Sequence, residues 1–173
     1  MSGMSLTSKA LSWSLLALGA CLFAPRAFAA DACTVAASVV DFGTYDPTSS
    51  TPLDGQGAVT VTCTGGNNLP VTIGVTTGGS NSFAQRRMTS GAEVLNYNLY
   101  TSSARSTILG TGTGGTSTVT CTVGLSSTDC AGSNPSGGTR VGVRTIYGRI
   151  TELQNVTGAG GQFTDTLTVN VTF

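Results

Sequence analysis

Apolar and polar residues alternate along several short stretches of this chain, and the clearest alternation closes the sequence. In residues 164–173 the apolar side chains are Leu167, Val169, Val171 and Phe173, and threonine or asparagine fills the even positions between them. Successive side chains of a strand point to opposite faces, so this segment is predicted to be a half-buried β-strand. Because the alternation continues to Phe173, we expect an unpaired strand edge here that another chain can pair with.

The same two-residue period recurs earlier in the chain. It appears in residues 59–63, 71–76, 95–100, 118–123 and 141–147. Turns rich in glycine and serine separate these segments, and helix start and stop signals are nearly absent. We interpret the glycine-rich run 110–117 as a long loop, because good strand patterns flank it. Seven or so short antiparallel strands of this kind predict an all-β sandwich or barrel.

Residues 1–30 are typical of an export signal. Lys9 precedes an apolar stretch, Pro25 interrupts it, and Ala27-Phe28-Ala29 matches a small-x-small cleavage site. The stretch is short for a membrane span, which needs about 20 apolar residues. We therefore expect cleavage near Ala30 and a single mature domain at 31–173. A lipidated Cys21 is the alternative, since Leu18-Gly19-Ala20-Cys21 resembles a lipoprotein box.

Charge and cysteine content narrow the function classes. Without the signal, six arginines face eight acidic residues, and no basic stripe suggests nucleic acid as a partner. Four cysteines remain after cleavage: Cys33, Cys63, Cys121 and Cys130. An even number in an exported chain predicts disulfides, for which three pairings are possible. We expect no metal, because the chain has no histidine and the cysteines lack zinc-site spacing.

Candidate catalytic groups are few, so an enzyme is not expected. The absence of histidine removes the usual general base, and we expect no cofactor. Asp41 and Asp46 flank a turn-like Tyr45-Asp46-Pro47, where turn formation is the simpler role. Arg144 and Arg149 lie in or beside a predicted strand, and we expect them to be exposed or paired with an acid such as Asp165.

Several ordered segments together resemble one family. They are Cys33-Thr34-Val35, Phe42-Gly43-Thr44-Tyr45-Asp46-Pro47, 59–63, 97–100, 108–112, Tyr147-Gly148-Arg149-Ile150 and the closing 165–173. This set is similar to the spore coat protein U domain, the subunit module of archaic (sigma-type) chaperone–usher pili. The similarity extends over nearly all of the predicted mature chain.

The resemblance implies an immunoglobulin-like sandwich that lacks its final strand. It further implies export to the periplasm, binding by a pilus chaperone that lends a strand, and ordering by an outer-membrane usher into a surface fibre with other pilus subunits. The apolar row Leu167, Val169, Val171 and Phe173 is then expected to be the partner-strand binding edge. For the disulfides we expect Cys33–Cys63, with Cys33 just before the first strand, and Cys121–Cys130, which closes a short loop.

The expected start of the mature chain departs from the family pattern. Only three residues, 30–32, would precede Cys33, and at about 3.3 Å each they reach at most ~10 Å. We therefore expect a subunit that accepts a strand but does not donate one, at a fibre tip or as an accessory. The alternatives are a freestanding spore-coat or envelope protein, and a carbohydrate-binding tip adhesin that uses Tyr45, Tyr97 and Tyr100.

Overall fold

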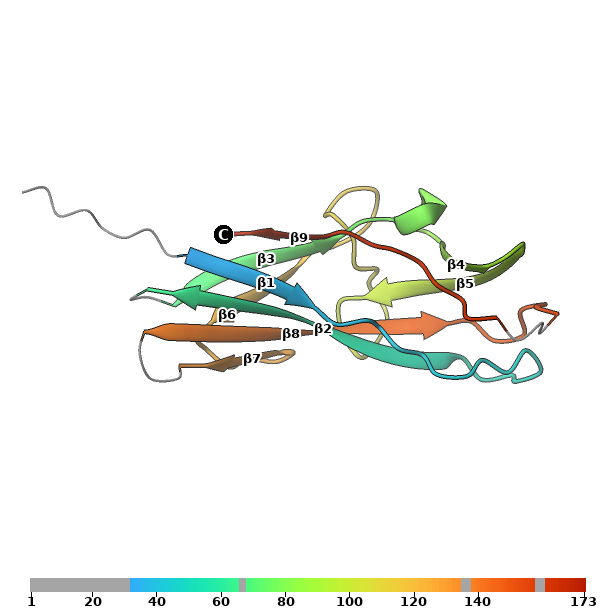
Figure 1. Ribbon diagram of the computed structural model, residues 1–173, viewed down its shortest axis with the longest axis horizontal. Helices are drawn as coiled ribbons and strands as arrows, with labels where there is room; N and C mark the ends of the chain where they lie inside the picture. The colour runs from blue at the N-terminus through green and yellow to red at the C-terminus, as the bar shows by residue number, and fades with distance from the viewer. Residues whose placement is uncertain (1–31, 66–67, 135–137, 158–160) are drawn as a thin grey trace, which may run out of the picture.

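Figure 1 shows the fold as a computed structural model, which describes residues 32–65, 68–134, 138–157 and 161–173. The expected signal segment therefore lies outside the described residues. Within the described residues, no helix is long and apolar enough to cross a membrane. These residues form nine strands and one short 3-10 turn: β1 (Ala32–Ala37), β2 (Leu53–Thr64), β3 (Leu69–Val75), η1 (Gly78–Ser80), β4 (Arg86–Ser90), β5 (Glu93–Tyr100), β6 (Val119–Val123), β7 (Cys130–Ser133), β8 (Thr139–Ile150) and β9 (Val169–Thr172).

The strands make two antiparallel sheets that form a sandwich. Sheet A has the order β1-β2-β8-β5-β4, and β7 also pairs with β8. Sheet B has the order β6-β3-β9. The two long strands β2 and β8 pair along their whole length, from Leu53 opposite Ile150 to Thr64 opposite Thr139. They are the centre of sheet A on which the remaining strands assemble.

The core lies between the sheets, where alternate side chains of both meet. Its fully buried members include Val59, Val61, Ile73, Val123 and Ile150. The sheets approach closely at Gly142 of β8, where a Cβ atom would lie 3.0 Å from the Cys121 Sγ atom and 3.2 Å from the Val123 Cα atom. A side chain at that site would have to push its neighbours outward by a few tenths of an ångström, so glycine allows the closest approach of the two sheets.

The predicted all-β sandwich of antiparallel strands is confirmed, and its two-sheet arrangement is immunoglobulin-like. The five earlier segments with a two-residue period lie in or overlap β2, β3, β5, β6 and β8. Three strands have no counterpart in that pattern: β1, β4 and β7. Cys33 lies inside the first strand rather than before it. The terminal strand is shorter than predicted, since it begins at Val169 and Leu167 belongs to the segment before it.

Candidate functional site

Each sheet ends in a strand whose outer edge is unpaired within the described residues. β1 is the last strand of sheet A next to β2, and β9 is the last strand of sheet B next to β3. β6 of sheet B packs on β8 of sheet A. From these two strands, sheet A continues through β2 to β1 and sheet B continues through β3 to β9, so both sheets end on the same long side of the sandwich. Figure 1 shows β1 and β9 on this side. We call this pair of edges the β1/β9 site.

Odd-numbered residues of β9 direct their backbone groups toward the open edge. The Thr76 N–H donates to the Thr168 carbonyl at 3.0 Å, so this pair is hydrogen-bonded across β3 and β9. In an antiparallel ladder, hydrogen-bonded and non-hydrogen-bonded pairs alternate. Asn170 and Thr172 therefore face β3, while Val169 and Val171 face outward. The side chains of Val169 and Val171 point inward, because they lie opposite Val75 and Ile73 of the core.

β1 has the same geometry on the other sheet. The Ser38 N–H donates to the Ala58 carbonyl at 2.8 Å, which makes the even positions of β1 the hydrogen-bonded ones. Cys33 and Cys63 form a non-hydrogen-bonded pair, and their Cα atoms are accordingly only 4.1 Å apart. Cys33, Val35 and Ala37 thus direct backbone groups to the open edge. Val35 lies opposite fully buried Val61.

The side chains at the β1/β9 site are apolar but incompletely covered. Leu167, Val169 and Val171 pack against the core yet are only partly buried. Val35 is 43% exposed, and Phe173 is 57% exposed. An apolar row that is half-buried beside unpaired backbone groups fits an added strand, which supplies hydrogen bonds and alternate apolar side chains.

Contacts before β9 hold the start of this strand in place. The Asp165 carboxylate accepts hydrogen bonds from the Tyr97 hydroxyl at 2.7 Å and from the Gly79 N–H at 3.0 Å. Burial and the hydrogen bond to Asp165 both raise the pKa of Tyr97. Thr164 pairs with Thr89 of sheet A, so the chain crosses from one sheet to the other before β9. The β9 edge is therefore positioned without an added strand.

The sequence patterns missed Arg86, the first residue of β4. Its exposed fraction is 0%, and its guanidinium donates to the carbonyls of Thr76 at 2.9 Å and Leu109 at 2.8 Å, and to the Asn98 side-chain oxygen at 2.6 Å. Burial lowers the pKa of Arg86. Because Thr76 also bonds with Thr168, Arg86 fixes the segment against which β9 begins.

The candidate polar residues have structural partners. The Asp46 carboxylate accepts hydrogen bonds from both the N–H and the hydroxyl of Thr48, and the latter chiefly lowers the pKa of Asp46. Arg149 pairs with Asp54 at 2.7 Å. Arg144 lies 3.8 Å from an Asp129 carboxylate oxygen, so both arginines pair with an acid, which was one of the two expectations. The acid is not Asp165, the example given for it, because Asp165 is engaged with Tyr97.

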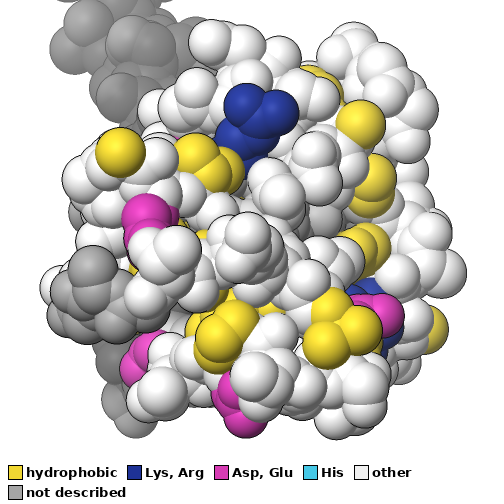
Figure 2. All heavy atoms as spheres, turned by 90° about the vertical axis from the view of Figure 1, so that its right-hand side faces the viewer, with side chains coloured by type: hydrophobic (Ala, Val, Ile, Leu, Met, Phe, Trp, Pro, Cys, Tyr) yellow, Lys and Arg dark blue, Asp and Glu magenta, His cyan; other side chains and the backbone are white. Residues whose placement is uncertain are grey.

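Two of the aromatic residues considered for carbohydrate binding have internal roles. Tyr97 is 4% exposed and forms an edge-on contact with Phe42. The Tyr45 hydroxyl donates to the Thr151 carbonyl and accepts from the Gln154 N–H. At the end of the sandwich away from β9, Figure 2 shows apolar side chains scattered among polar groups. Because Tyr97 is buried and the Tyr45 hydroxyl is engaged internally, these two rings do not form an exposed platform on which a sugar could stack.

The four cysteines form the two bridges expected from the sequence. Cys33 and Cys63 join β1 to β2 within sheet A, with an S–S distance of 2.07 Å. Cys121 and Cys130 join β6 to β7 and so link the two sheets. Among the described residues, no group of histidine, cysteine, aspartate or glutamate side chains could hold a metal ion.

The comparisons with known proteins agree with this architecture. The spore coat protein U domain matches residues 20–170, so the chain belongs to this family. A search of curated proteins found no match.

A solved structure with a similar fold is the chaperone–tip adhesion subunit pre-assembly complex CsuC–CsuE, from archaic chaperone–usher Csu pili of Acinetobacter baumannii. The TM-score to a chain of this complex is 0.53, with 23% identity over 83% of the present chain. The match covers 40% of that other chain, so the present chain spans well under two thirds of its length. At this identity, the similarity shows the fold.

Proposed function

We propose that this protein is a structural subunit of a chaperone–usher surface fibre, which accepts an extended strand from a partner at the β1/β9 site. The observation that carries the proposal is that the two open edges have the same arrangement of backbone groups and side chains. At both edges, the residues that direct backbone groups outward also direct apolar side chains inward. Membership of the spore coat protein U domain family supports it, as does the fold shared with a chain of a chaperone–subunit complex.

The geometry specifies the chemistry of the partner strand. Main-chain hydrogen bonds to the open edge require no particular sequence, whereas the inward positions require apolar side chains at every second residue. A charge at an inward position would be taken out of water with no partner, which costs several kcal/mol. The partner segment is therefore extended, with alternate apolar residues.

The partners follow from this role. A periplasmic pilus chaperone would supply the first strand, an outer-membrane usher would receive the subunit, and another pilus subunit would complete the sandwich. The protein would pass through the periplasm to the cell surface, as the expected export signal at 1–30 requires. A subunit of this kind acts by strand pairing and needs no catalytic group, so we propose that the chain is not an enzyme.

The position in the fibre depends on signal cleavage. If cleavage falls near Ala30, the short segment before Cys33 does not reach along a neighbour's edge, which places the subunit at a tip or in an accessory role. Intact-mass analysis of the exported protein determines that start point. A start that leaves a dozen or more residues before Cys33 would contradict the terminal role while leaving strand acceptance intact.

A peptide-binding experiment separates a fibre subunit from a freestanding envelope protein. The probe is a synthetic peptide with six alternating valine–threonine pairs between terminal lysines, and the control replaces two central valines with aspartate. A ligand that binds only the folded state raises the melting temperature. We expect the alternating peptide to raise it and the control peptide to leave it unchanged. A folded protein whose melting temperature responds to neither peptide would favour the freestanding alternative.

A further inference from the structure

Strand β8 has a second edge, which two different strands share. β5 pairs with Tyr147–Ile150 on this edge, and β7 pairs with Val141–Arg144 further along it. The Thr145 N–H donates to the Asp129 carbonyl just before β7, at 3.2 Å. By the antiparallel alternation, the backbone groups of Val143 and Thr145 face β7. The Val141 carbonyl lies on the same edge and accepts from the Gly124 N–H at 3.1 Å. If β7 moved away, this part of β8 would become another open strand edge.

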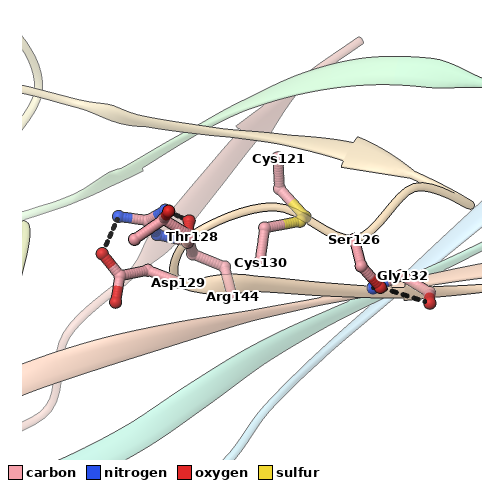
Figure 3. Close-up of a disulfide and its surroundings, with 7 residues drawn as sticks. All are labelled: Cys121, Ser126, Thr128, Asp129, Cys130, Gly132 and Arg144. Carbon is pink, nitrogen blue, oxygen red and sulfur yellow. Dashed lines mark hydrogen bonds and ion pairs between the residues drawn. A yellow bond between two sulfur atoms is a disulfide. The ribbon is translucent and has the colours of Figure 1, made fainter.

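β7 is held over that edge by a covalent bond and a closed hairpin. The Cys121–Cys130 disulfide joins it to β6 of the opposite sheet. The Ser126 hydroxyl donates to the Gly132 carbonyl at 3.0 Å and accepts from the Gly132 N–H at 3.1 Å, as Figure 3 shows. Gly132 packs directly on the backbone of Leu125, since a Cβ atom there would overlap the Leu125 carbonyl carbon. These contacts hold the hairpin in one closed conformation over the β8 edge.

Arg144 lies beneath this hairpin with its side chain toward the core. It is opposite Val59 on one side and Cys130 on the other, and it is 8% exposed. Its guanidinium donates to the Thr128 carbonyl at 3.3 Å and lies 3.8 Å from an Asp129 carboxylate oxygen. Figure 3 shows these contacts beside the disulfide. Both partners belong to the loop that leads into β7.

A third contact of Arg144 comes from outside the hairpin, where its guanidinium donates to the Thr101 carbonyl at 2.7 Å. The Nε atom is buried and has no hydrogen-bond partner within the described residues. The cation thus depends on the hairpin for its only acidic partner in the described structure. Removal of one partner from a buried ion pair is costly, because the remaining charge is left uncompensated.

We propose that Arg144 is a specificity-determining residue that confines strand exchange to the β1/β9 site. A foreign apolar strand on the β7 side of β8 would displace Thr128 and Asp129 and leave the cation unpaired beside apolar side chains. An inward-pointing charge is a known way of blocking pairing at a strand edge. At the β1/β9 site, by contrast, the described inward side chains of β1 and β9 are apolar.

The proposal rests on the proposed function, since it concerns which edge accepts a strand. The competing occupant that Arg144 excludes is the apolar terminal strand of a second copy of this chain. That strand carries Val169 and Val171 at alternate positions and has an edge of its own to pair. The Cys121–Cys130 bridge keeps β7 paired with β8. When β7 leaves this edge, the unpaired charge of Arg144 prevents the terminal strand of a second copy from taking its place.

The test compares the exported wild-type protein with C121A/C130A, with R144M and with the triple variant C121A/C130A/R144M. A control variant, C121A/C130A/R144K, preserves the charge at position 144. Amide hydrogen exchange at Val143 and Thr145 reports the edge under β7. Exchange at Gly142 and Arg144, whose backbone groups face β2, reports whether the sandwich is folded. Sedimentation equilibrium reports self-association, and all variants have the same β1/β9 site, so differences among them arise at β8. No strand peptide is used, so this result is independent of the peptide test of the proposed function.

We expect C121A/C130A to exchange at least tenfold faster at Val143 and Thr145 while it associates no more than the wild type. The triple variant should dimerise at a concentration at least tenfold lower, and the R144K version should not. Unchanged exchange at Val143 in C121A/C130A would show that the bridge does not hold β7. Equal association of C121A/C130A and the triple variant, or no added association in the triple variant, would overturn the role of Arg144.

A second variant covers the case in which C121A/C130A loses protection at Gly142 and is unfolded. Gly132→Ala keeps both cysteines but forces the hairpin away from Leu125. With Arg144→Met it should associate at least tenfold more readily than Gly132→Ala alone. Equal association of these two variants would overturn the proposal in the same way.

Discussion

Substitution of Val169 by aspartate should damage both the folding and the strand binding of this protein. Val169 points inward from β9 opposite the buried Val75, and it is only partly covered. The variant loses about half of a valine's burial, roughly 1 kcal/mol. It also places a carboxylate against an apolar surface, at a cost on the order of 2 kcal/mol for a half-buried site.

The matched control is Asn170→Asp, which introduces the same charge one residue along the same strand. Asn170 is exposed and its side chain points away from the core, so its substitution should change the free energy of unfolding by no more than about 0.5 kcal/mol. The expected difference of about 3 kcal/mol corresponds to a factor of roughly a hundred in the unfolding equilibrium. For a domain of this size, it lowers the melting temperature by ~10 °C.

Thermal unfolding of both variants, with and without the alternating valine–threonine peptide, measures the two effects. Val169→Asp should melt lower and should no longer be stabilised by the peptide, while Asn170→Asp should respond as the wild type does. Equal losses in the two variants would refute the assignment of inward and outward faces on β9. A Val169→Asp protein that still binds the peptide would refute the placement of the added strand.

Other expectations concern the interior and the disulfides. Arg86→Met leaves the backbone carbonyl oxygens of Thr76 and Leu109 without their donor, and at about 1–3 kcal/mol for each buried acceptor it should lower the free energy of unfolding in urea by at least about 2 kcal/mol. Arg87→Met on the exposed face of β4 should have little effect. Because the pKa of Tyr97 is raised in the folded state, its contribution to stability is present below pH ~10 and is lost as the pH rises further, so Tyr97→Phe should flatten the fall in melting temperature above that pH. Non-reducing peptide mapping should return the bridges Cys33–Cys63 and Cys121–Cys130, each contributing about 3 kcal/mol through loop closure; free thiols or crossed pairs would contradict the fold.

The alternation of apolar and polar residues was sufficient to predict the sandwich, because half-buried strands impose a two-residue period. The three strands without this signal lack a regular alternation of apolar and polar residues. β1 carries mostly small residues, β4 begins with the buried Arg86, and the four residues of β7 are Cys-Ala-Gly-Ser. Tertiary contacts, rather than local pattern, place these strands.

The candidate site was predictable only in part for the same reason. The row that includes Val169 and Val171 is visible in the sequence, but the partner edge on β1 depends on pairing with β2, far along the chain. The roles of Arg86 and Arg144 were not predictable, because a lone arginine in a strand pattern indicates an exposed side chain. Their burial follows from carbonyl groups that only the folded chain brings together.

Amide hydrogen exchange on binding of the alternating peptide tests strand acceptance most directly. On β9, the N–H groups of Asn170 and Thr172 already face β3, while those of Val169 and Val171 face the open edge. Bound peptide should therefore slow exchange at Val169 and Val171 by tenfold or more and leave Asn170 and Thr172 nearly unchanged. Slowed exchange at the even positions alone, or at neither set while the peptide is bound, would contradict the proposal that β9 accepts a partner strand.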